Sequence, residues 1–581
     1  MSSTKLSITN LCVSFPGVKA VDGINLSLNV GETLGIVGES GSGKSVTALS
    51  ILKLINSPGK ISSGEILFIG DENLNEKNLL SLSENALQKI RGRKIGMIFQ
   101  EPSTALNPVL KCGDQVAEVL IEHKNISKEE ARKQTIEFFH KVKLQRAEEI
   151  YDAYPHQLSG GQKQRVMIAM AICCKPEILI ADEPTTALDV TVQKSVLTLL
   201  RELKEEMKMS MIFISHDLSV ISEVADRVAV MYKGKIVEEG NVNDILRFPK
   251  HPYTKGLFAC RPQPQFRLGQ LPVIADFMKE EEDGGLIETG ETIESLRTKF
   301  ALNVVTEESR MKKIYSSEPI LKVNHLTTSF PVRSGIFSNV KSHINAVNDV
   351  SFDVYQGETL GLVGESGCGK TTLGRTILRL VQSTSGEIIF KGKEITNLHG
   401  EDLRKIRRDM QIIFQDPYAS LNPKMSIGKA IVEPMENFNL YAGNSERRKK
   451  AIELLERVHL KSEHFDRFPH EFSGGQRQRV CIARALATNP EFIICDECVT
   501  ALDVSVQAVI LNLLNELKRD FNFTSIFISH DLSVVRHMSD RIMVMKDGRI
   551  IEVGESEDVF KSPKENYTKE LVESINQSAH S

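Results

Sequence analysis

The sequence predicts an α/β protein in which one kind of domain occurs twice, each copy built on a mostly parallel central sheet. A chain of 581 residues is too long for one ordinary hydrophobic core, so at least two domains are expected. Short apolar runs such as Thr33–Val37 enter glycine-rich turns, which is typical of strands buried on both faces of a parallel sheet. In addition, several short motifs occur once in each half of the chain.

The composition narrows the class of protein. The chain is 41% hydrophobic and 25% charged with a formal net charge of −4, so we do not expect the basic surface of a nucleic-acid-binding protein. No stretch approaches the roughly 20 apolar residues of a membrane-spanning helix, and the first residues do not resemble a signal peptide. We therefore expect a cytoplasmic protein that reaches a membrane only through partners. Nine scattered cysteines argue against a disulfide framework.

Each half contains a glycine-rich loop of the form GxxxxGK[ST] directly after an apolar run. Its glycines let backbone N–H groups surround phosphate oxygens, its lysine reaches the β- and γ-phosphates, and its last hydroxyl binds Mg²⁺. The helix that follows adds the positive end of its dipole. These loops predict two sites for ATP with Mg²⁺, and their residues are Gly38, Glu39, Ser40, Gly41, Ser42, Gly43, Lys44 and Ser45 in the first half, and Gly364, Glu365, Ser366, Gly367, Cys368, Gly369, Lys370 and Thr371 in the second.

Two acidic residues stand together at the end of a predicted strand in each half. Asp182 and Asp496 end apolar runs, which places them at the phosphate end of the sheet, where an acid orients Mg²⁺. Glu183 and Glu497 follow them and are positioned to polarise the attacking water. The plain alternative is a pair of solvated acids, which the preceding phosphate loop disfavours. We predict that the glutamates are catalytic and that the aspartates belong to the metal site.

A Ser-Gly-Gly-Gln motif precedes a predicted helix in each half. We expect these helices from Arg165 to Cys173 and from Arg479 to Ala487. A serine and free N–H groups at a helix start form an anion site of their own, although such a triplet is by itself usually only a turn. The motif residues are Ser159, Gly160, Gly161 and Gln162, and Ser473, Gly474, Gly475 and Gln476.

The motifs occur in the same order in both halves. After the phosphate loop come a glutamine, the Ser-Gly-Gly-Gln signature, the acidic strand end, an Ala-Leu-Asp loop at 187–189 or 501–503, and a histidine. This order resembles the ATP-binding-cassette (ABC) family of P-loop ATPases, and it does so twice across nearly the whole chain. The resemblance implies that each domain adds an antiparallel β part and a helical subdomain to its central sheet.

The resemblance also implies how ATP is bound and hydrolysed. Cassettes of this family dimerise head to tail, so that each ATP lies between the phosphate loop of one cassette and the signature serine of the other. Both sites appear complete in the sequence, so two hydrolysing sites are expected. The implied sets are Lys44 and Glu183 with Ser473, and Lys370 and Glu497 with Ser159.

Four more residues take their expected roles from the resemblance. His216 and His530 would contact the γ-phosphate as catalytic residues, although a lone histidine is more often structural. Gln100 and Gln415 would bind Mg²⁺ and transmit motion to a membrane partner. The metal site would then consist of Ser45, Gln100 and Asp182 in the first half, and Thr371, Gln415 and Asp496 in the second.

Two aromatic residues and one departure from the family pattern also bear on the predicted sites. Phe15 and Phe330 are candidates to stack on adenine, but core packing is nearly as plausible for a single aromatic residue. Cys498 follows Glu497 where the first half has Pro184, and we expect this change to loosen the turn into the Ala-Leu-Asp loop.

Short tails after each cassette favour one group of importers. Residues 251–257 begin His-Pro-Tyr-Thr, and residues 565–571 match from Tyr567 onward. These tails resemble those of dipeptide, oligopeptide and nickel importer ATPases, and the fused pair of cassettes resembles ATPases that import glutathione or short peptides. The first tail contains only Cys260, so we predict no iron–sulphur cluster of the kind that some relatives carry.

The resemblance implies the partners. They would be two transmembrane permeases and an extracytoplasmic solute-binding protein, with this chain on the cytoplasmic side of the inner membrane and no nucleic acid bound. One alternative is a ribosome-associated tandem-cassette translation factor, but such factors have a long charged helical linker and lack these tails. Another alternative is an importer for a different solute such as nickel.

The motifs and tails suggest the domain boundaries. We expect the first cassette at 1–260, a tail and linker at 261–318, the second cassette at 319–560 and a short tail at 561–581. Within the linker, residues 279–285 are acidic and interrupted by glycine, which is typical of an exposed connection rather than a core.

Overall fold

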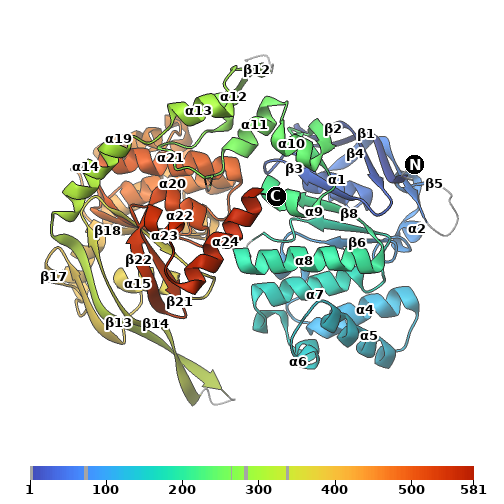
Figure 1. The fold of residues 1–581 in the computed structure, drawn as a ribbon, viewed down its shortest axis with the longest axis horizontal. Helices are drawn as coiled ribbons and strands as arrows, with labels where there is room; N and C mark the ends of the chain where they lie inside the picture. The colour runs from blue at the N-terminus through green and yellow to red at the C-terminus, as the bar shows by residue number, and fades with distance from the viewer. Residues whose placement is uncertain are drawn as a thin grey trace. The chain divides into compact units, whose positions relative to one another are not determined.

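The computed structural model describes residues 4–580 with the exception of 71–75, 187, 264, 281–285 and 335–338. The chain forms two compact units, each an α/β body (Figure 1), and the predicted α/β class is confirmed. One unit comprises Met1–Phe258 and Ile274–Gly290, and the other comprises Ala259–Val273 and Glu291–His580.

The central sheet of the first unit is parallel except at one edge. Its strand order is β10-β9-β3-β8-β7-β6, and only the β9–β10 pair is antiparallel. Every residue of β3, β7 and β8 is buried, as the apolar runs predicted. The strands are β3 (Thr33–Val37), β6 (Ile95–Ile98), β7 (Ile178–Asp182), β8 (Ser210–Ser215), β9 (Arg227–Tyr232) and β10 (Lys235–Asn241).

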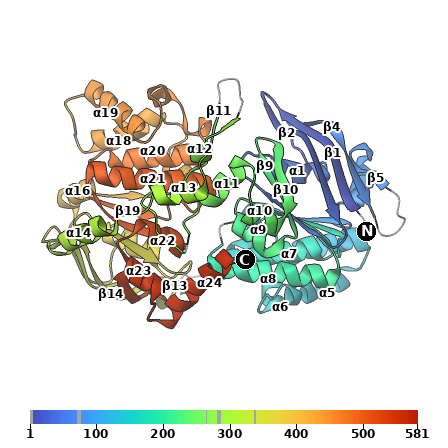
Figure 2. The ribbon, with the colours of Figure 1, turned by 45° about the horizontal axis from the view of Figure 1, so that its top comes forward.

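An antiparallel sheet forms a second layer of this unit, visible as the blue strands in Figure 2. Its order is β2-β1-β4-β5, and it shares one hydrophobic core with helix α1 (Lys44–Ile51) and with one face of the central sheet. The core therefore holds the helix that follows the phosphate loop. The strands are β1 (Thr4–Phe15), β2 (Val18–Asn29), β4 (Lys60–Ile69) and β5 (Glu76–Asn78).

The remaining helices of the first unit include a helical part, α4 to α7, that packs with α8 in a separate hydrophobic core. Figure 1 shows α7, the last helix of this part, running alongside α8. The bounds are η1 (Leu79–Ser81), α2 (Glu84–Gln88), α3 (Pro102–Ala105), α4 (Cys112–Lys124), α5 (Lys128–Lys141), α6 (Ala147–Asp152), η2 (Pro155–Gln157), α7 (Gly160–Ile172), α8 (Val190–Met207), α9 (Leu218–Val224), α10 (Val242–Arg247) and α11 (Pro252–Ala259).

The second unit repeats the two sheets. Its central sheet has the order β18-β19-β20-β15-β21-β22, antiparallel only between β21 and β22, and its second sheet has the order β14-β13-β16-β17. The strands are β13 (Pro319–Ser334), β14 (Asn339–Tyr355), β15 (Thr359–Val363), β16 (Ser385–Phe390), β17 (Lys393–Glu394), β18 (Met410–Ile413), β19 (Phe492–Asp496), β20 (Thr524–Ser529), β21 (Arg541–Lys546) and β22 (Arg549–Glu555).

The helices of the second unit follow the same plan, with α15 after the phosphate loop and a helical part around α18 to α20. Their bounds are α15 (Lys370–Ile377), α16 (Gly400–Asp409), α17 (Pro417–Ser420), α18 (Ile427–Asn437), α19 (Asn444–Arg457), η3 (Ser462–Asp466), η4 (Pro469–Glu471), α20 (Gly474–Leu486), α21 (Val504–Phe521), α22 (Leu532–Met538), α23 (Ser556–Lys561) and α24 (Asn566–His580). Within the described residues, every helix falls short, in length or in apolar character, of what crossing a bilayer requires.

The segment between the cassettes has structure of its own. Its elements are α12 (Ile274–Phe277), β11 (Met278–Glu280), β12 (Leu286–Glu288), α13 (Ile293–Lys299) and α14 (Val304–Tyr315), whereas most of the acidic stretch expected as an exposed connection, 281–285, lies outside the described residues. Two parts of this segment belong to the second unit. There the Asn512 side chain pairs with the backbone of Leu271, accepting from its N–H at 2.9 Å and donating to its carbonyl at 2.8 Å.

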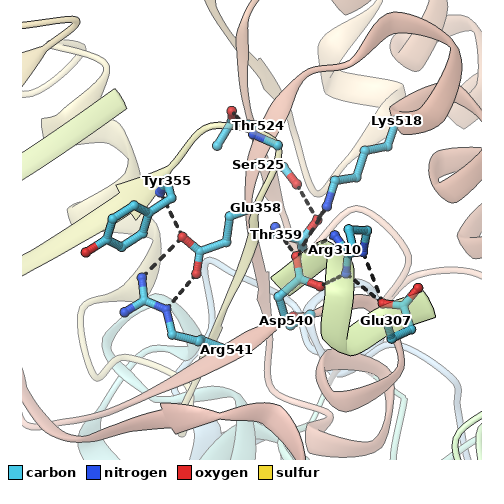
Figure 3. A network of polar contacts seen from close by, with 12 residues as sticks. Glu307, Arg310, Tyr355, Glu358, Thr359, Lys518, Thr524, Ser525, Asp540 and Arg541 are labelled. Atoms are coloured by element: carbon cyan, nitrogen blue, oxygen red, sulfur yellow. Dashed lines mark hydrogen bonds and ion pairs between the residues drawn. The ribbon is translucent and has the colours of Figure 1, made fainter. Parts of the chain in front are cut away.

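Helix α14 joins a buried charge network of the second unit (Figure 3). Arg310 pairs with Asp540, whose side chain is 3% exposed and also accepts a 2.8 Å hydrogen bond from the Thr359 N–H at the start of β15. Lys518 lies 3.5 Å from the same carboxylate. These contacts fasten the segment before the second cassette to the strand that leads into its phosphate loop.

Candidate functional site

Each phosphate loop lies between the first strand of the central sheet and the helix that follows. In the first unit it joins β3 to α1, and a Cβ added at Gly38 would stand 2.2 Å from the Met231 carbonyl oxygen. Gly43 has a φ of 103°, and a Cβ there would stand 2.5 Å from the Ala20 carbonyl oxygen. Only glycine fits at these two positions, because the loop passes directly against neighbouring backbone.

The loop lysine is folded back over its own loop. Lys44 is 4% exposed, and its Nζ donates to the carbonyl oxygens of Gly38 at 2.8 Å and Glu39 at 2.9 Å. Lys370 makes the same pair of contacts with the second loop, at 2.7 and 2.8 Å. The buried ammonium is thus held inside the loop by two backbone carbonyl oxygens, where it places a positive charge beside the loop N–H groups.

One hydroxyl in the first loop has no protein partner. Within the described residues, the buried Ser42 Oγ makes no hydrogen bond, as expected for a group that faces a ligand. The second loop has Cys368 at this position, with its Sγ 3.9 Å from the Lys370 ammonium. Burial raises the pKa of this thiol. The two loops therefore differ by one strong hydrogen-bonding group.

A hydroxyl and a carboxylate meet beside each loop. Ser45 donates to Asp182 Oδ1 at 3.0 Å, and Thr371 donates to Asp496 Oδ1 at 2.8 Å. Burial raises the pKa of Asp182 to about 6, and it raises that of Asp496 as well. Oxygen donors of this kind are the ligands that Mg²⁺ prefers.

The first glutamate lies at the centre of a polar cluster. Glu183 follows β7 with a φ of 46°, and its Oε2 accepts from Gln100 Nε2 at 3.0 Å and from the Thr186 hydroxyl at 2.9 Å. His216 Nδ1 lies 3.3 Å from the same oxygen, and Lys44 Nζ lies 3.9 Å from Oε1. Burial alone would raise the pKa of Glu183, but His216, Lys44 and Thr186 together lower it to about 2. The carboxylate is therefore ionised at neutral pH.

The second glutamate has similar neighbours but is held less tightly. Glu497 Oε2 accepts from Gln415 Nε2 at 3.0 Å, and Lys370 Nζ lies 3.9 Å from its Oε1. His530 Nδ1 is 3.8 Å away, and Thr500 donates to the backbone carbonyl of Glu497 instead of its side chain. Against burial, the same kinds of neighbours lower the pKa of Glu497.

The signature serines cap helices. Ser159 is the N-cap of α7: its Oγ accepts from the Gln162 N–H at 3.3 Å, and the Gln162 side chain accepts from the Ser159 N–H at 3.0 Å. Ser473 and Gln476 repeat this capping box at α20 with the same distances. The helices begin at Gly160 and Gly474, earlier than we predicted, so the signature glycines form their first turns.

The structure thus gathers some predicted residues and separates others. In each unit the phosphate loop, the glutamine, both acids and the histidine form one cluster. The signatures belong to the helical part, whose helix α7 packs in a different core from α1. Phe15 is partly buried against the core, close to Gly59, whereas Phe330 is 44% exposed. Their contact with adenine stays a prediction, and Ala187 of the Ala-Leu-Asp loop lies outside the described residues.

Sequence reasoning missed one contact at the phosphate loops. Tyr253, from the first tail, accepts a 2.9 Å hydrogen bond from the Glu39 N–H, and Tyr567 accepts one of 3.0 Å from the Glu365 N–H. A signal was present in the sequence, because these two tyrosines are separated by 314 residues, the same spacing as Ser159 and Ser473.

Comparison with known protein families identifies the clusters. A family model described as ABC transporter matches residues 21–186 and 347–500, which span both phosphate loops and both acidic strand ends. The chain belongs to the ABC transporter family. This ABC protein is therefore an ATPase with two ATP-binding cassettes. A second family model, described as the C-terminal region of oligopeptide/dipeptide transporters, matches 237–284 and 551–580, the regions of the two tails.

Relatives of this ABC ATPase match it over almost its entire length. A protein of Pectobacterium atrosepticum named glutathione import ATP-binding protein GsiA is 46% identical over 575 residues, covering 98% of this chain and 89% of the relative. The protein of the same name from Escherichia coli (strain K12) is 47% identical over 583 residues with the same coverage. A solved dimeric cassette, MJ0796 bound to ADP and Pi, is 31% identical and covers 41% of this chain and 98% of its own, at a TM-score of 0.37.

Proposed function

We propose that this ATPase energises the import of glutathione or short peptides across a membrane. The observation that carries the proposal is the duplicated cluster: both cassettes pair a loop hydroxyl with an aspartate, and both surround a glutamate with lysine, glutamine and histidine. The proposed cargo is supported by the names of relatives that are 46–47% identical to this chain over 98% of its length. The match of both tails to oligopeptide/dipeptide transporters points to the same cargo class.

Each phosphate loop would bind the β- and γ-phosphates of ATP. Lys44 and Lys370 would exchange some of their carbonyl contacts for phosphate oxygens, and the Ser42 hydroxyl would gain a partner. Mg²⁺ would neutralise phosphate charge. Its protein ligands would be the adjacent hydroxyl and carboxylate oxygens with the glutamine nearby, namely Ser45, Asp182 and Gln100, or Thr371, Asp496 and Gln415.

The glutamates would act on the attacking water. Glu183 is ionised and already accepts several hydrogen bonds, so a water that replaces one donor would be oriented and polarised by its carboxylate. His216 would bridge this carboxylate and the γ-phosphate. Glu497 and His530 would do the same at the second site.

ATP would lie between the two cassettes. The first phosphate loop would face Ser473, and the second would face Ser159, so that each nucleotide holds the pair together. Hydrolysis would remove the γ-phosphate contacts and release the cassettes. This switch between two states is driven by the difference in contacts to ATP and ADP.

The partners would be two permeases and an extracytoplasmic solute-binding protein, with this chain on the cytoplasmic side of the inner membrane. Gln100 and Gln415 would transmit motion to the permeases. We expect no iron–sulphur cluster, because Cys260 is the only cysteine of the first tail. Iron or acid-labile sulphide in the purified protein would contradict that expectation.

Reconstitution tests the proposal. The chain is placed in proteoliposomes with candidate permeases and a candidate solute-binding protein, and uptake of labelled glutathione, dipeptides and Ni²⁺ is followed with and without ATP. We expect ATP-driven uptake of glutathione or peptides that is lost in the double variant Glu183→Gln, Glu497→Gln. ATP hydrolysis without uptake of any of these solutes would overturn the cargo. Co-purification with ribosomes in place of permeases would favour the translation-factor alternative.

A further inference from the structure

We propose that Tyr253 and Tyr567, one from each tail, are positioning residues that hold the phosphate loops in the form that binds ATP. The inference rests on the proposed role of these loops and deepens it. It gives the tails a function inside the cassette, in addition to any contact that they make with other proteins.

The contact is the same in both cassettes. The phenol oxygen of Tyr253 accepts the N–H of Glu39, the second residue of the phosphate loop, at 2.9 Å. Tyr567 accepts the N–H of Glu365, at the equivalent position, at 3.0 Å. Tyr253 is fully buried and Tyr567 is 8% exposed, so each hydrogen bond is shielded from water. Two independent copies of one buried contact argue against chance packing.

The tail helices are anchored close to these tyrosines. Glu238, on β10, accepts the backbone N–H groups of Lys250 at 2.8 Å and His251 at 3.0 Å, just before α11 begins. Glu552, on β22, accepts the N–H groups of Lys564 at 2.9 Å and Glu565 at 3.1 Å, just before α24. Each tail is therefore fixed to the edge strand of the central sheet, which makes it a rigid support for the phenol group.

The tyrosine rings are fixed by the strand that runs beside the loop. The ring centre of Tyr253 lies 4.4 Å from that of Tyr232, the last residue of β9. In the second cassette Lys546, the last residue of β21, places its ammonium 4.6 Å from the Tyr567 ring centre. The neighbouring residues change, but the phenol group stays at the same loop position.

The same loop residue also contacts the phosphate-binding lysine. The Glu39 carbonyl accepts from Lys44 Nζ at 2.9 Å, and the Glu365 carbonyl accepts from Lys370 Nζ at 2.8 Å. One residue thus joins the tail tyrosine, through its N–H, to the phosphate-binding lysine, through its carbonyl. Loss of the phenol hydroxyl would remove this acceptor from the N–H and hold the residue less firmly. The lysine would then lose a fixed position.

Substitution of the phenol oxygen tests the inference. Tyr253→Phe and Tyr567→Phe are made singly and together in a Glu183→Gln, Glu497→Gln background that binds ATP without consuming it. The dissociation constants of ATP and AMP are then measured by calorimetry. We expect the ATP constant to rise roughly three- to tenfold in the double variant, because a buried donor loses its acceptor. The AMP constant should stay within about twofold, since AMP has no β- or γ-phosphate.

The matched control is Tyr151→Phe, which removes the hydroxyl of another buried tyrosine in the first cassette. This hydroxyl donates to Asp114 Oδ1 at 3.1 Å, and both residues are far along the chain from the phosphate loop. A purely structural role would lower thermal stability in all variants and leave the ATP constant unchanged. An unchanged ATP constant, or an equal rise for ATP and AMP, overturns the inference. If the parent chain instead binds no ATP at its phosphate loops, the proposed function fails first.

Discussion

The Thr186 hydroxyl donates a 2.9 Å hydrogen bond to the Oε2 atom of Glu183. In the second cassette the corresponding hydroxyl, of Thr500, donates to a backbone carbonyl, and that glutamate lacks this support. Between the glutamate and the threonine, the first cassette has Pro184 where the second has Cys498. The Glu183 carboxylate is therefore held by one more neutral donor than the Glu497 carboxylate.

This difference predicts unequal effects of two matched substitutions. Thr186→Val removes a donor from the carboxylate, so Glu183 becomes less well oriented and its lowered pKa rises. We expect kcat for ATP to fall roughly two- to fivefold. Thr500→Val leaves the Glu497 carboxylate contacts intact and should change kcat less than about twofold. Steady-state ATPase assays measure both variants, and equal losses would contradict the structural difference.

The glutamates themselves should each be essential for normal turnover. Glu183→Gln and Glu497→Gln keep the size of the side chain and one acceptor oxygen but remove the negative charge that polarises water. Loss of a general base costs roughly a hundredfold or more in rate at its own site. Each single variant should therefore be clearly slower than the parent chain in the same ATPase assay. Full parental activity after either change would show that the cassette concerned does not hydrolyse ATP.

The pH dependence of Mg²⁺ binding follows from Asp182. Burial raises its pKa to about 6, so the carboxyl is ionised at pH 7.5 and mostly protonated at pH 5.5. A protonated carboxyl is a poor metal ligand, and the Mg²⁺ concentration at half-maximal activity should rise about fourfold at the lower pH. The fold should survive, because a carboxyl with a raised folded pKa binds its proton more tightly in the folded than in the unfolded chain, so protonation of Asp182 does not destabilise the fold.

ATP titrates in the same range, and a variant separates the two effects. Asp182→Asn keeps the titration of ATP and abolishes that of the carboxyl, so its binding of Mg²⁺ should be weaker but less dependent on pH. Mg²⁺ titrations of both proteins at the two pH values provide the comparison. An identical pH shift in the parent and in the variant would assign the effect to ATP alone.

Much of the site was predictable because its parts are local in sequence. The position of Lys44 follows from a strand, a glycine-rich loop and a helix that are consecutive in sequence. The position of Asp182 follows from the buried strand that ends at this residue. The contact between Glu39 and Tyr253 joins residues 214 positions apart, and that between Arg310 and Asp540 joins residues 230 apart. Such pairs depend on how distant segments pack, and the hydrophobic periodicity of a single element carries no information about them. Only the repeat spacing shared by Tyr253 and Tyr567 pointed to the first contact.

The buried network at Asp540 predicts a difference in stability between the cassettes. Asp540→Asn leaves Arg310 and Lys518 without their buried counter-charge, and breaking such a pair typically costs about 3–5 kcal/mol. Asp226 occupies the equivalent position in the first cassette, but its side chain is 61% exposed. Asp226→Asn should therefore cost less than about 1 kcal/mol.

Amide hydrogen exchange of the whole chain measures these effects locally. Protection of β15 should fall in Asp540→Asn, whereas protection of β3 should hardly change in Asp226→Asn. Equal losses in the two strands would show that the charges near α14 do not stabilise the second cassette.

The two duties of the signature serine can be separated by one substitution. Ser159 caps α7, and asparagine is as good an N-cap as serine, so Ser159→Asn should leave thermal stability almost unchanged. The asparagine amide lacks the small hydroxyl group that we propose to donate a hydrogen bond to the γ-phosphate of ATP. We therefore expect kcat to fall at least about tenfold. Ser159→Ala should lose both the turnover and roughly 1 kcal/mol of capping energy.

Ser473→Asn and Ser473→Ala repeat the test at α20, where the capping box has the same geometry. Thermal unfolding and ATPase rates of the four variants distinguish helix capping from nucleotide contact. If the asparagine variants retained parental turnover, these serines would serve only their own helices. The proposed position of ATP, between the phosphate loop of one cassette and the signature of the other, would then lose its support, because these hydroxyls are the groups that we propose to contact each γ-phosphate.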